Sequence, residues 1–208
     1  MSFGYEEQPF TMFKISILGI KGVGKSTFAK SLFPPGFKIF DANTYLTIGI
    51  DFYPYDYPLS SSKSDNFIRY SIWVLNPDSP FKSQLHYYLH GSSAILIIFD
   101  VSNPTSLDLF EYWMEIIKKN CGNSPTALLG NKADLKNHLK DAKALADSLV
   151  KKYQLMAYYE ISALQSWNIK PIFNDLTNYF AQIFPSIKER MRDNKHEYTR
   201  KLKNNLLN

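Results

Sequence analysis

The chain has 208 residues and a mass of 24.0 kDa, with 45% apolar and 21% charged side chains, which is room for one ordinary globular domain and some spare chain. A single cysteine excludes a disulfide framework and any zinc site built from several cysteines. The 24 lysines and arginines outnumber the 19 aspartates and glutamates, and the resulting net charge of +5 is compatible with nucleic acid, an anionic membrane or neither.

The apolar pattern predicts short strands that alternate with helices. Strands are expected at 13–18, 48–57, 67–74, 94–100, 126–129 and 156–161, and helices at 25–33, 84–91 and 169–184, with further helices between the last three strands. Pro54 and Pro58 assign the second strand to a sheet edge, because proline cannot donate to a strand ladder. The alternation predicts an α/β fold whose six-stranded, mostly parallel sheet carries helices on both faces, with ligands at the carboxyl ends of the strands.

The first predicted strand runs into a glycine-rich phosphate loop, residues 19–26, that matches the full G-x-x-x-x-G-K-[ST] pattern. Its backbone N–H groups would cradle phosphate oxygens, Lys25 would reach the β- and γ-phosphates, and the Ser26 hydroxyl would bind Mg²⁺. A glycine-rich turn without a ligand is the alternative, but the strand before and the helix after are the context the motif requires. The residues expected to bind the nucleotide here are Lys21, Gly22, Val23, Gly24, Lys25, Ser26 and Thr27.

A second motif, Asn131-Lys132-Ala133-Asp134, follows the strand that ends at Gly130. A carboxylate at Asp134 can accept hydrogen bonds from guanine N1–H and the exocyclic amine, whereas adenine has no matching donor pair. The last strand ends in residues 160–164, whose backbone N–H groups could contact guanine O6. The residues expected to surround the base are Asn131, Lys132, Asp134, Ser162, Ala163 and Leu164.

With these motifs in order, the chain resembles the Ras superfamily of small GTPases, and the Rab branch most closely, over residues 13–184. The phosphate loop, residues 47–52 (TIGIDF), Ile72-Trp73, residues 130–135 (GNKADL) and residues 160–163 (EISA) carry the resemblance. It implies a P-loop NTPase with a Ras-like G domain that binds GTP or GDP with Mg²⁺. Residues 1–12 would then be an N-terminal extension and residues 185–208 a C-terminal tail.

The resemblance also assigns roles around the first switch. Thr47 would bind Mg²⁺ through its hydroxyl and the γ-phosphate through its backbone N–H, and would act with Lys25 in catalysis. An aromatic side chain before it should stack on guanine. Phe37 and Phe40 both remain candidates, because the stretch from Lys25 to Thr47 is longer than usual in the family.

The second switch departs from the family pattern Asp-x-x-Gly-Gln, because residues 74–78 read Val-Leu-Asn-Pro-Asp. Val74 replaces the carboxylate that holds a Mg²⁺-bound water. Pro77 replaces a glycine whose N–H bonds the γ-phosphate, and proline has no N–H. Asp78 replaces the glutamine that orients the attacking water, so the catalytic position carries a different residue from the one the family uses.

Two further sets of residues bear on this departure. Lys21 stands in the phosphate loop where the family often has a small residue; it would crowd an incoming arginine finger or supply a positive charge in its place. If residues 74–78 are not the segment that corresponds to the family pattern, Asp56, Asp78 or Asp100 is a conceivable partner for the metal instead.

The excess charge belongs to the tail. Residues 186–208 hold seven basic and three acidic side chains, which is +4 of the net +5, so the rest of the chain is nearly neutral and no nucleic-acid partner is expected. Apolar residues in this segment mostly follow an i+4 row, which predicts a basic amphipathic helix. It would extend the last helix into solvent, fold onto the domain, or make weak contact with a membrane surface or a partner.

These patterns predict a GTP/GDP switch with slow intrinsic hydrolysis that engages protein effectors and regulators through its switch regions. The alternative is a non-cycling pseudo-GTPase that holds nucleotide for structure and serves as an interaction module. Because the second residue is Ser2 and the C-terminal sequence lacks cysteine, no lipid anchor is expected. The first ten residues lack a basic start and a long apolar stretch, so no secretory signal is expected either. A cytoplasmic location, with peripheral membrane contact at most, is therefore expected.

Overall fold

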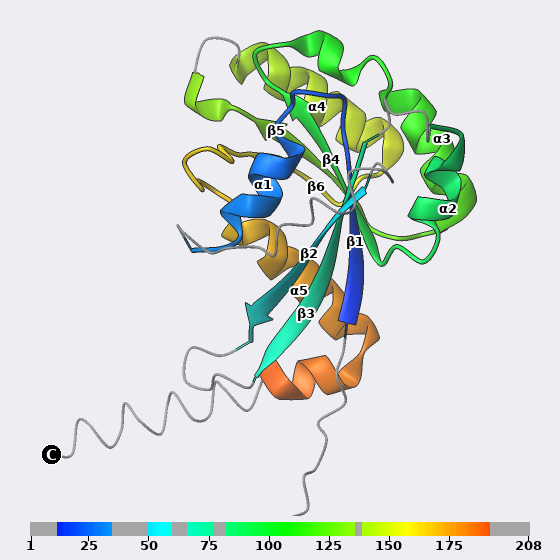
Figure 1. Ribbon diagram of the computed structural model, residues 1–208, viewed down its shortest axis with the longest axis vertical. Helices are drawn as coiled ribbons and strands as arrows, with labels where there is room; N and C mark the ends of the chain where they lie inside the picture. Colours follow the sequence, from blue (N-terminus) through cyan, green and yellow to red (C-terminus); the bar gives the residue numbers. More distant parts are fainter. Residues whose placement is uncertain (1–11, 35–49, 60–65, 77–81, 136–138, 192–208) are drawn as a thin grey trace, which may run out of the picture.

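The computed structural model describes residues 12–34, 50–59, 66–76, 82–135 and 139–191 (Figure 1). Its elements alternate along the chain as the apolar pattern predicts. The strands are β1 (Met12–Leu18), β2 (Ile50–Pro58), β3 (Phe67–Leu75), β4 (Ala94–Asp100), β5 (Thr126–Asn131) and β6 (Ala157–Glu160). The helices are α1 (Lys25–Ser31), α2 (Leu85–Leu89), α3 (Phe110–Cys121), α4 (Leu139–Tyr153) and α5 (Lys170–Ile183), with 3-10 turns at Lys82–Gln84, Pro104–Leu107 and Ala133–Leu135.

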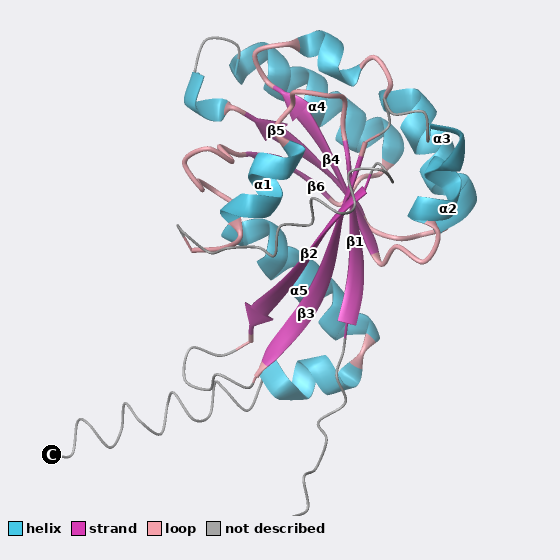
Figure 2. Cartoon of the chain, in the orientation of Figure 1, coloured by secondary structure: helices cyan, strands magenta, loops and turns pink. Residues whose placement is uncertain are grey.

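The strands form one six-stranded sheet in the order β2-β3-β1-β4-β5-β6 (Figure 2). β2 runs antiparallel to β3, and every other neighbouring pair is parallel. The α/β fold class is confirmed. The edge position expected for the proline-containing strand is also confirmed, because β2 pairs on one side only and carries both Pro54 and Pro58.

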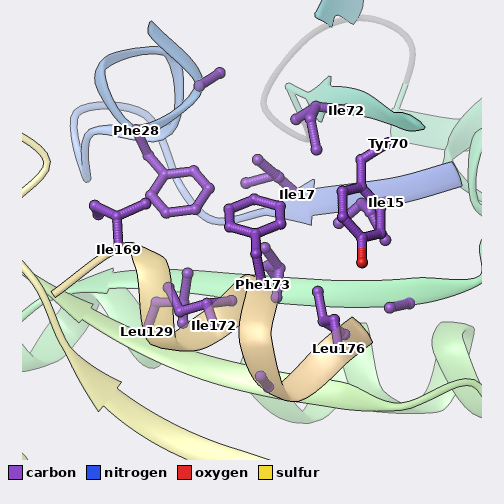
Figure 3. Close-up of a cluster of buried hydrophobic side chains, with 14 of the residues drawn as sticks. Ile15, Ile17, Phe28, Tyr70, Ile72, Leu129, Ile169, Ile172, Phe173 and Leu176 are labelled. Carbon is purple, nitrogen blue, oxygen red and sulfur yellow. The ribbon is translucent and has the colours of Figure 1, made fainter. Parts of the chain in front are cut away.

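Two apolar clusters sandwich the sheet. On one face α1 and α5 pack on β1, β3 and β2, and on the other α2, α3 and α4 pack on β4 and β5. β4 is buried along its whole length, as a central strand covered on both faces must be. Figure 3 shows the first cluster, in which Phe173 of α5 lies between Phe28 of α1 and Tyr70 of β3. These layers hold the loops at the carboxyl ends of the strands in place.

The helix expected at 84–91 is shorter than predicted. α2 ends at Leu89, and His90 already has an extended backbone, with φ −56° and ψ 136°. Gly91, with φ +73°, follows His90, and a glycine in this left-handed conformation is a common helix end. The Lys14 ammonium donates to the carbonyl oxygens of Tyr88 at 2.7 Å and of His90 at 2.8 Å, so this helix end is also tied to β1.

The first part of the tail packs against the domain. Residues 185–191 are helical, Ile187 is fully buried, and Met191 packs on the core. The Arg190 guanidinium donates from Nε to Oδ1 of Asn66 at 3.0 Å and from Nη2 to the Phe67 carbonyl at 2.5 Å. Of the alternatives left open for the tail, residues 185–191 thus adopt the helix folded onto the domain, so the packed chain runs past the boundary expected at residue 184.

The remaining tail residues, 192–208, lie outside the described part of the chain, as do residues 1–11. In the part that is described, none of the helices combines the length and the apolar character needed to cross a bilayer.

Candidate functional site

The phosphate loop joins β1 to α1 at the carboxyl edge of the sheet, and two of its glycines have no substitute. Gly24 has φ +100°, and a Cβ there would lie 2.2 Å from Nδ2 of Asn131. A Cβ on Gly19, which has φ +151°, would lie 2.4 Å from the Ile98 carbonyl oxygen. The loop therefore needs glycine both for its backbone angles and for its close approach to the neighbouring strands.

Lys25 folds back over this loop. Its side chain is largely buried, and its ammonium donates to the carbonyl oxygens of Gly19 at 2.7 Å and of Ile20 at 2.9 Å. These bonds hold a positive charge against the loop that the motif assigns to phosphate binding.

A cavity of about 370 Å³ opens between the phosphate loop and the ends of β2 and β3. It is lined from the loop and α1 by Lys21, Gly22, Gly24, Lys25, Ser26 and Thr27, and from the two strands and the residue after β3 by Ile50, Asp51, Val74 and Asn76. Six of the seven loop residues expected to bind the nucleotide therefore share one cavity with Val74, the first residue expected in the second switch. Val23, the seventh, is buried and contributes its carbonyl to a contact described next.

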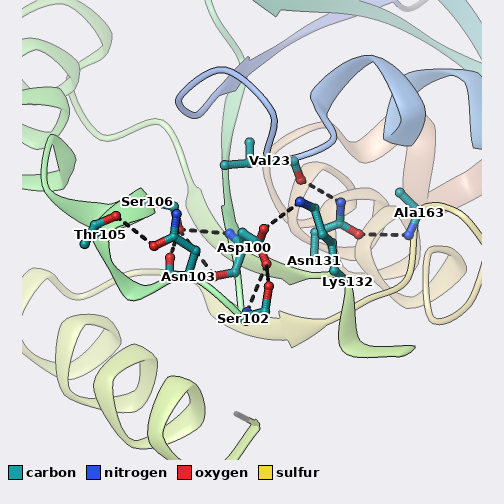
Figure 4. A network of polar contacts seen from close by, with 9 residues as sticks. All are labelled: Val23, Asp100, Ser102, Asn103, Thr105, Ser106, Asn131, Lys132 and Ala163. Carbon is teal, nitrogen blue, oxygen red and sulfur yellow. Dashed lines mark hydrogen bonds and ion pairs between the residues drawn. The ribbon is translucent and has the colours of Figure 1, made fainter. Parts of the chain in front are cut away.

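Asn131 connects the phosphate loop to the base loops (Figure 4). Its Nδ2 donates to the Val23 carbonyl at 2.7 Å, and its Oδ1 accepts from the backbone N–H of Ala163 at 2.9 Å. Asn131 is 3% exposed, so both bonds are shielded from water. One amide side chain thereby holds together the loops that follow β1, β5 and β6.

Replacing Asn131 with alanine should destabilise the fold measurably. Both the Val23 carbonyl and the Ala163 N–H would be left buried without a partner, at about 1–3 kcal/mol each. We expect a loss of about 2–6 kcal/mol in unfolding free energy, or roughly 4–24 °C in melting temperature by calorimetry. Asn120→Ala is the control, because Asn120 is only half-buried and bonds the Ile116 carbonyl within its own helix. Equal melting temperatures for the two variants would contradict this role.

The base loops bring Asp134 and Ser162 together. Ser162 Oγ donates to Oδ1 of Asp134 at 2.6 Å and accepts from the backbone N–H of Gln165 at 3.2 Å. Asp134 remains half-buried, and the neighbouring Leu164 side chain is 79% exposed. The expected base-recognition residues therefore converge from the loops after β5 and β6, with the Asp134 carboxylate oriented by a hydroxyl.

Lys132, the other charged residue of this motif, is paired with Asp100 at the end of β4. Its ammonium lies 2.5 Å from Oδ2 of Asp100, whose Oδ1 accepts from both the backbone and the hydroxyl of Ser102. Burial by itself would raise the pKa of the Asp100 carboxyl, but the bonds from Lys132 and Ser102 outweigh it and lower that pKa. Asp100 is thus a structural anion that fixes the base loop.

The alternative metal partners are not supported where the structure describes them. Asp100 is engaged by Lys132, and Asp56 forms an exposed ion pair with Arg69 at 2.5 Å; neither lines the phosphate-loop cavity. Asp51 does line it. The sequence does not distinguish Asp51 within the motif at 47–52, whereas the pairing of β2 with β3 places it opposite Val74. The remaining expected site residues, Phe37, Phe40, Thr47, Pro77 and Asp78, lie outside the described residues.

Comparison with known proteins agrees with this arrangement. The family model described as Ras family matches residues 14–182. Ras-related protein Rab-13 of Mesocricetus auratus is 30% identical over 167 residues, covering 79% of this chain and 78% of the relative, and that of Bos taurus has the same values. Ras-related protein RabT1 of Dictyostelium discoideum is 27% identical over 191 residues, covering 90% and 82%. Since the matched segment contains the phosphate loop, the Asn131 bridge and both base loops, the chain belongs to the Ras family of small GTPases.

Proposed function

We propose that this chain binds GTP and GDP with Mg²⁺ at the carboxyl edge of its sheet and acts as a guanine-nucleotide switch with slow intrinsic hydrolysis. The observation that carries the proposal is the Asn131 bridge, which ties the phosphate loop to the loops that carry the Asp134–Ser162 pair. Phosphate contacts alone would serve any nucleotide, whereas an oriented carboxylate at the base position selects guanine.

The residues divide the work as follows. The phosphate-loop backbone and Lys25 bind the β- and γ-phosphates, and Asp134 accepts the two guanine N–H groups. Leu164 presents its backbone N–H to O6, while the N–H of Ala163 is held by Asn131. Ser26 and Thr47 supply the hydroxyl ligands of Mg²⁺, which when bound neutralises charge that develops on the phosphates. Phe37 or Phe40 stacks on the base. Hydroxyl and carboxylate oxygens at the cavity are the hard donors that Mg²⁺ prefers.

The switch regions are the surfaces through which this chain engages effectors and regulators, as Ras-family GTPases do. A cytoplasmic location follows from this role.

The nucleotide that accompanies the purified protein tests the proposal. We expect about one equivalent of GDP or GTP on denaturing the protein and separating the supernatant by ion-exchange chromatography. An adenine nucleotide in its place, or failure of nucleotide-free protein to take up GDP, would refute guanine-nucleotide binding.

A non-cycling nucleotide-binding module is the second candidate, and Val74 favours it. This side chain is 4% exposed and lines the cavity where the family pattern has a carboxylate. The hydrolysis rate separates the two candidates.

A further inference from the structure

The phosphate-loop cavity has an apolar side chain, Val74, where the family pattern has a carboxylate. By the family pattern, residue 74 would carry the carboxylate that holds a water on Mg²⁺. Valine cannot accept a hydrogen bond, so a metal bound beside Ser26 would lack that support from β3. Outer carboxylates of this kind orient metal ligands, and their removal typically weakens metal binding about 10–100-fold.

The antiparallel pairing of β2 with β3 places a different carboxylate directly beside Val74. The register sets Asp51 directly opposite Val74, and Phe52 opposite Trp73. Residues directly opposite in an antiparallel pair project from the same face of the sheet with their Cβ atoms about 4.5–5.5 Å apart. Asp51 therefore stands on the face of the sheet that Val74 occupies.

Other observations agree on the direction of Asp51. It lines the cavity together with Val74, Ser26 and Lys25. Tyr53, two residues along the same strand face, is buried against the core, and burial together with the negative charge of Asp51 raises its pKa to about 12. Among the lining residues that belong to the described part of the chain, Asp51 is the sole carboxylate, and the same cavity contains the lysines Lys21 and Lys25.

We propose that Asp51 takes over from residue 74 and supplies the carboxylate that positions the water ligands of the nucleotide-bound Mg²⁺. The role has moved from the end of β3 to its partner strand β2, one step across the ladder. This inference rests on the proposed nucleotide binding and assigns to Asp51 a positioning role in the metal site.

The test measures release of a fluorescent GDP analogue from the full chain across a Mg²⁺ titration. In the Asp51→Asn variant we expect the Mg²⁺ concentration that half-suppresses release to rise about 10–100-fold, with release in EDTA unchanged. Adding Val74→Asp to Asp51→Asn should restore the wild-type midpoint, because the carboxylate returns to β3. Thermal melting of each variant reports whether it is folded, and Asp51→Asn alone suffices for the decision.

Asp56→Asn is the matched control. It removes the same charge from the same strand, but Asp56 lies on the opposite face in its exposed pair with Arg69, so the Mg²⁺ midpoint should stay at the wild-type value. An unchanged midpoint in Asp51→Asn, an equal shift in Asp56→Asn, or Mg²⁺-independent release from the wild type would each overturn the inference. Failure of the wild type to bind the GDP analogue at all would instead refute the proposed function.

Discussion

An Asp134→Ala variant is expected to bind GDP about 10²–10⁴-fold more weakly than the wild type and to lose its preference for guanine over adenine. The carboxylate accepts two guanine N–H groups, and each hydrogen bond to a charged group contributes about 1.5–3 kcal/mol. The substitution also removes the carboxylate to which the Ser162 hydroxyl donates at 2.6 Å. Competition of GDP and ADP against a fluorescent guanine nucleotide measures both effects.

Asp141→Ala is the control for that experiment. Asp141 is an exposed carboxylate in the first turn of α4, so its removal changes the net charge equally without touching the base loops. Its affinity for GDP should match that of the wild type. Retained guanine selectivity in a folded Asp134→Ala protein would contradict the base-site assignment.

Single-turnover GTP hydrolysis is expected to be slower than the roughly 3–5 × 10⁻⁴ s⁻¹ of a typical Ras protein without its activator. Asp78 stands where a glutamine would orient the attacking water, and its carboxylate would repel the γ-phosphate. Pro77 cannot donate an N–H to the same phosphate. Restoring the family pattern with Pro77→Gly and Asp78→Gln together should raise the rate at least about 10-fold, measured by chromatography of GTP and GDP over time.

The unaltered protein decides between the two proposed roles. Hydrolysis at or above the typical rate, dependent on Mg²⁺, would contradict the slow-switch proposal. Undetectable hydrolysis with tight GDP and GTP binding would support the non-cycling module. The matched control is Lys25→Ala in the restored background, where loss of the phosphate-binding ammonium should remove the gained activity.

The phosphate loop, the base loops and the central strand could be predicted from local sequence patterns, because each depends on residues that are adjacent in sequence. The fully apolar run of β4 and the glycine spacing of residues 19–26 determine their local structure directly. The contact of Lys14 with the end of α2 could not be predicted, because Lys14 lies on another strand.

The position of Asp51 at the cavity could not be predicted either, because it too depends on a contact between strands. Its pairing with Val74 is set by the register across a hairpin, and neither residue alone indicates it. The tail posed a different problem, since an amphipathic pattern reads the same whether the apolar side meets solvent, a membrane or the domain. Only the contacts of Ile187 and Arg190 distinguish these possibilities for residues 185–191.

The anchoring of Arg190 beside Phe67 has a consequence for how the molecule can be approached. Phe67 begins β3, and Val74 near its other end lines the phosphate-loop cavity, so the two points are separated by seven strand steps, or roughly 23 Å. In Figure 1 the orange segment accordingly lies at the end of the sheet away from the phosphate loop. The helix at residues 185–191 therefore packs at the end of the sheet opposite the phosphate loop, and it leaves the phosphate-loop edge uncovered.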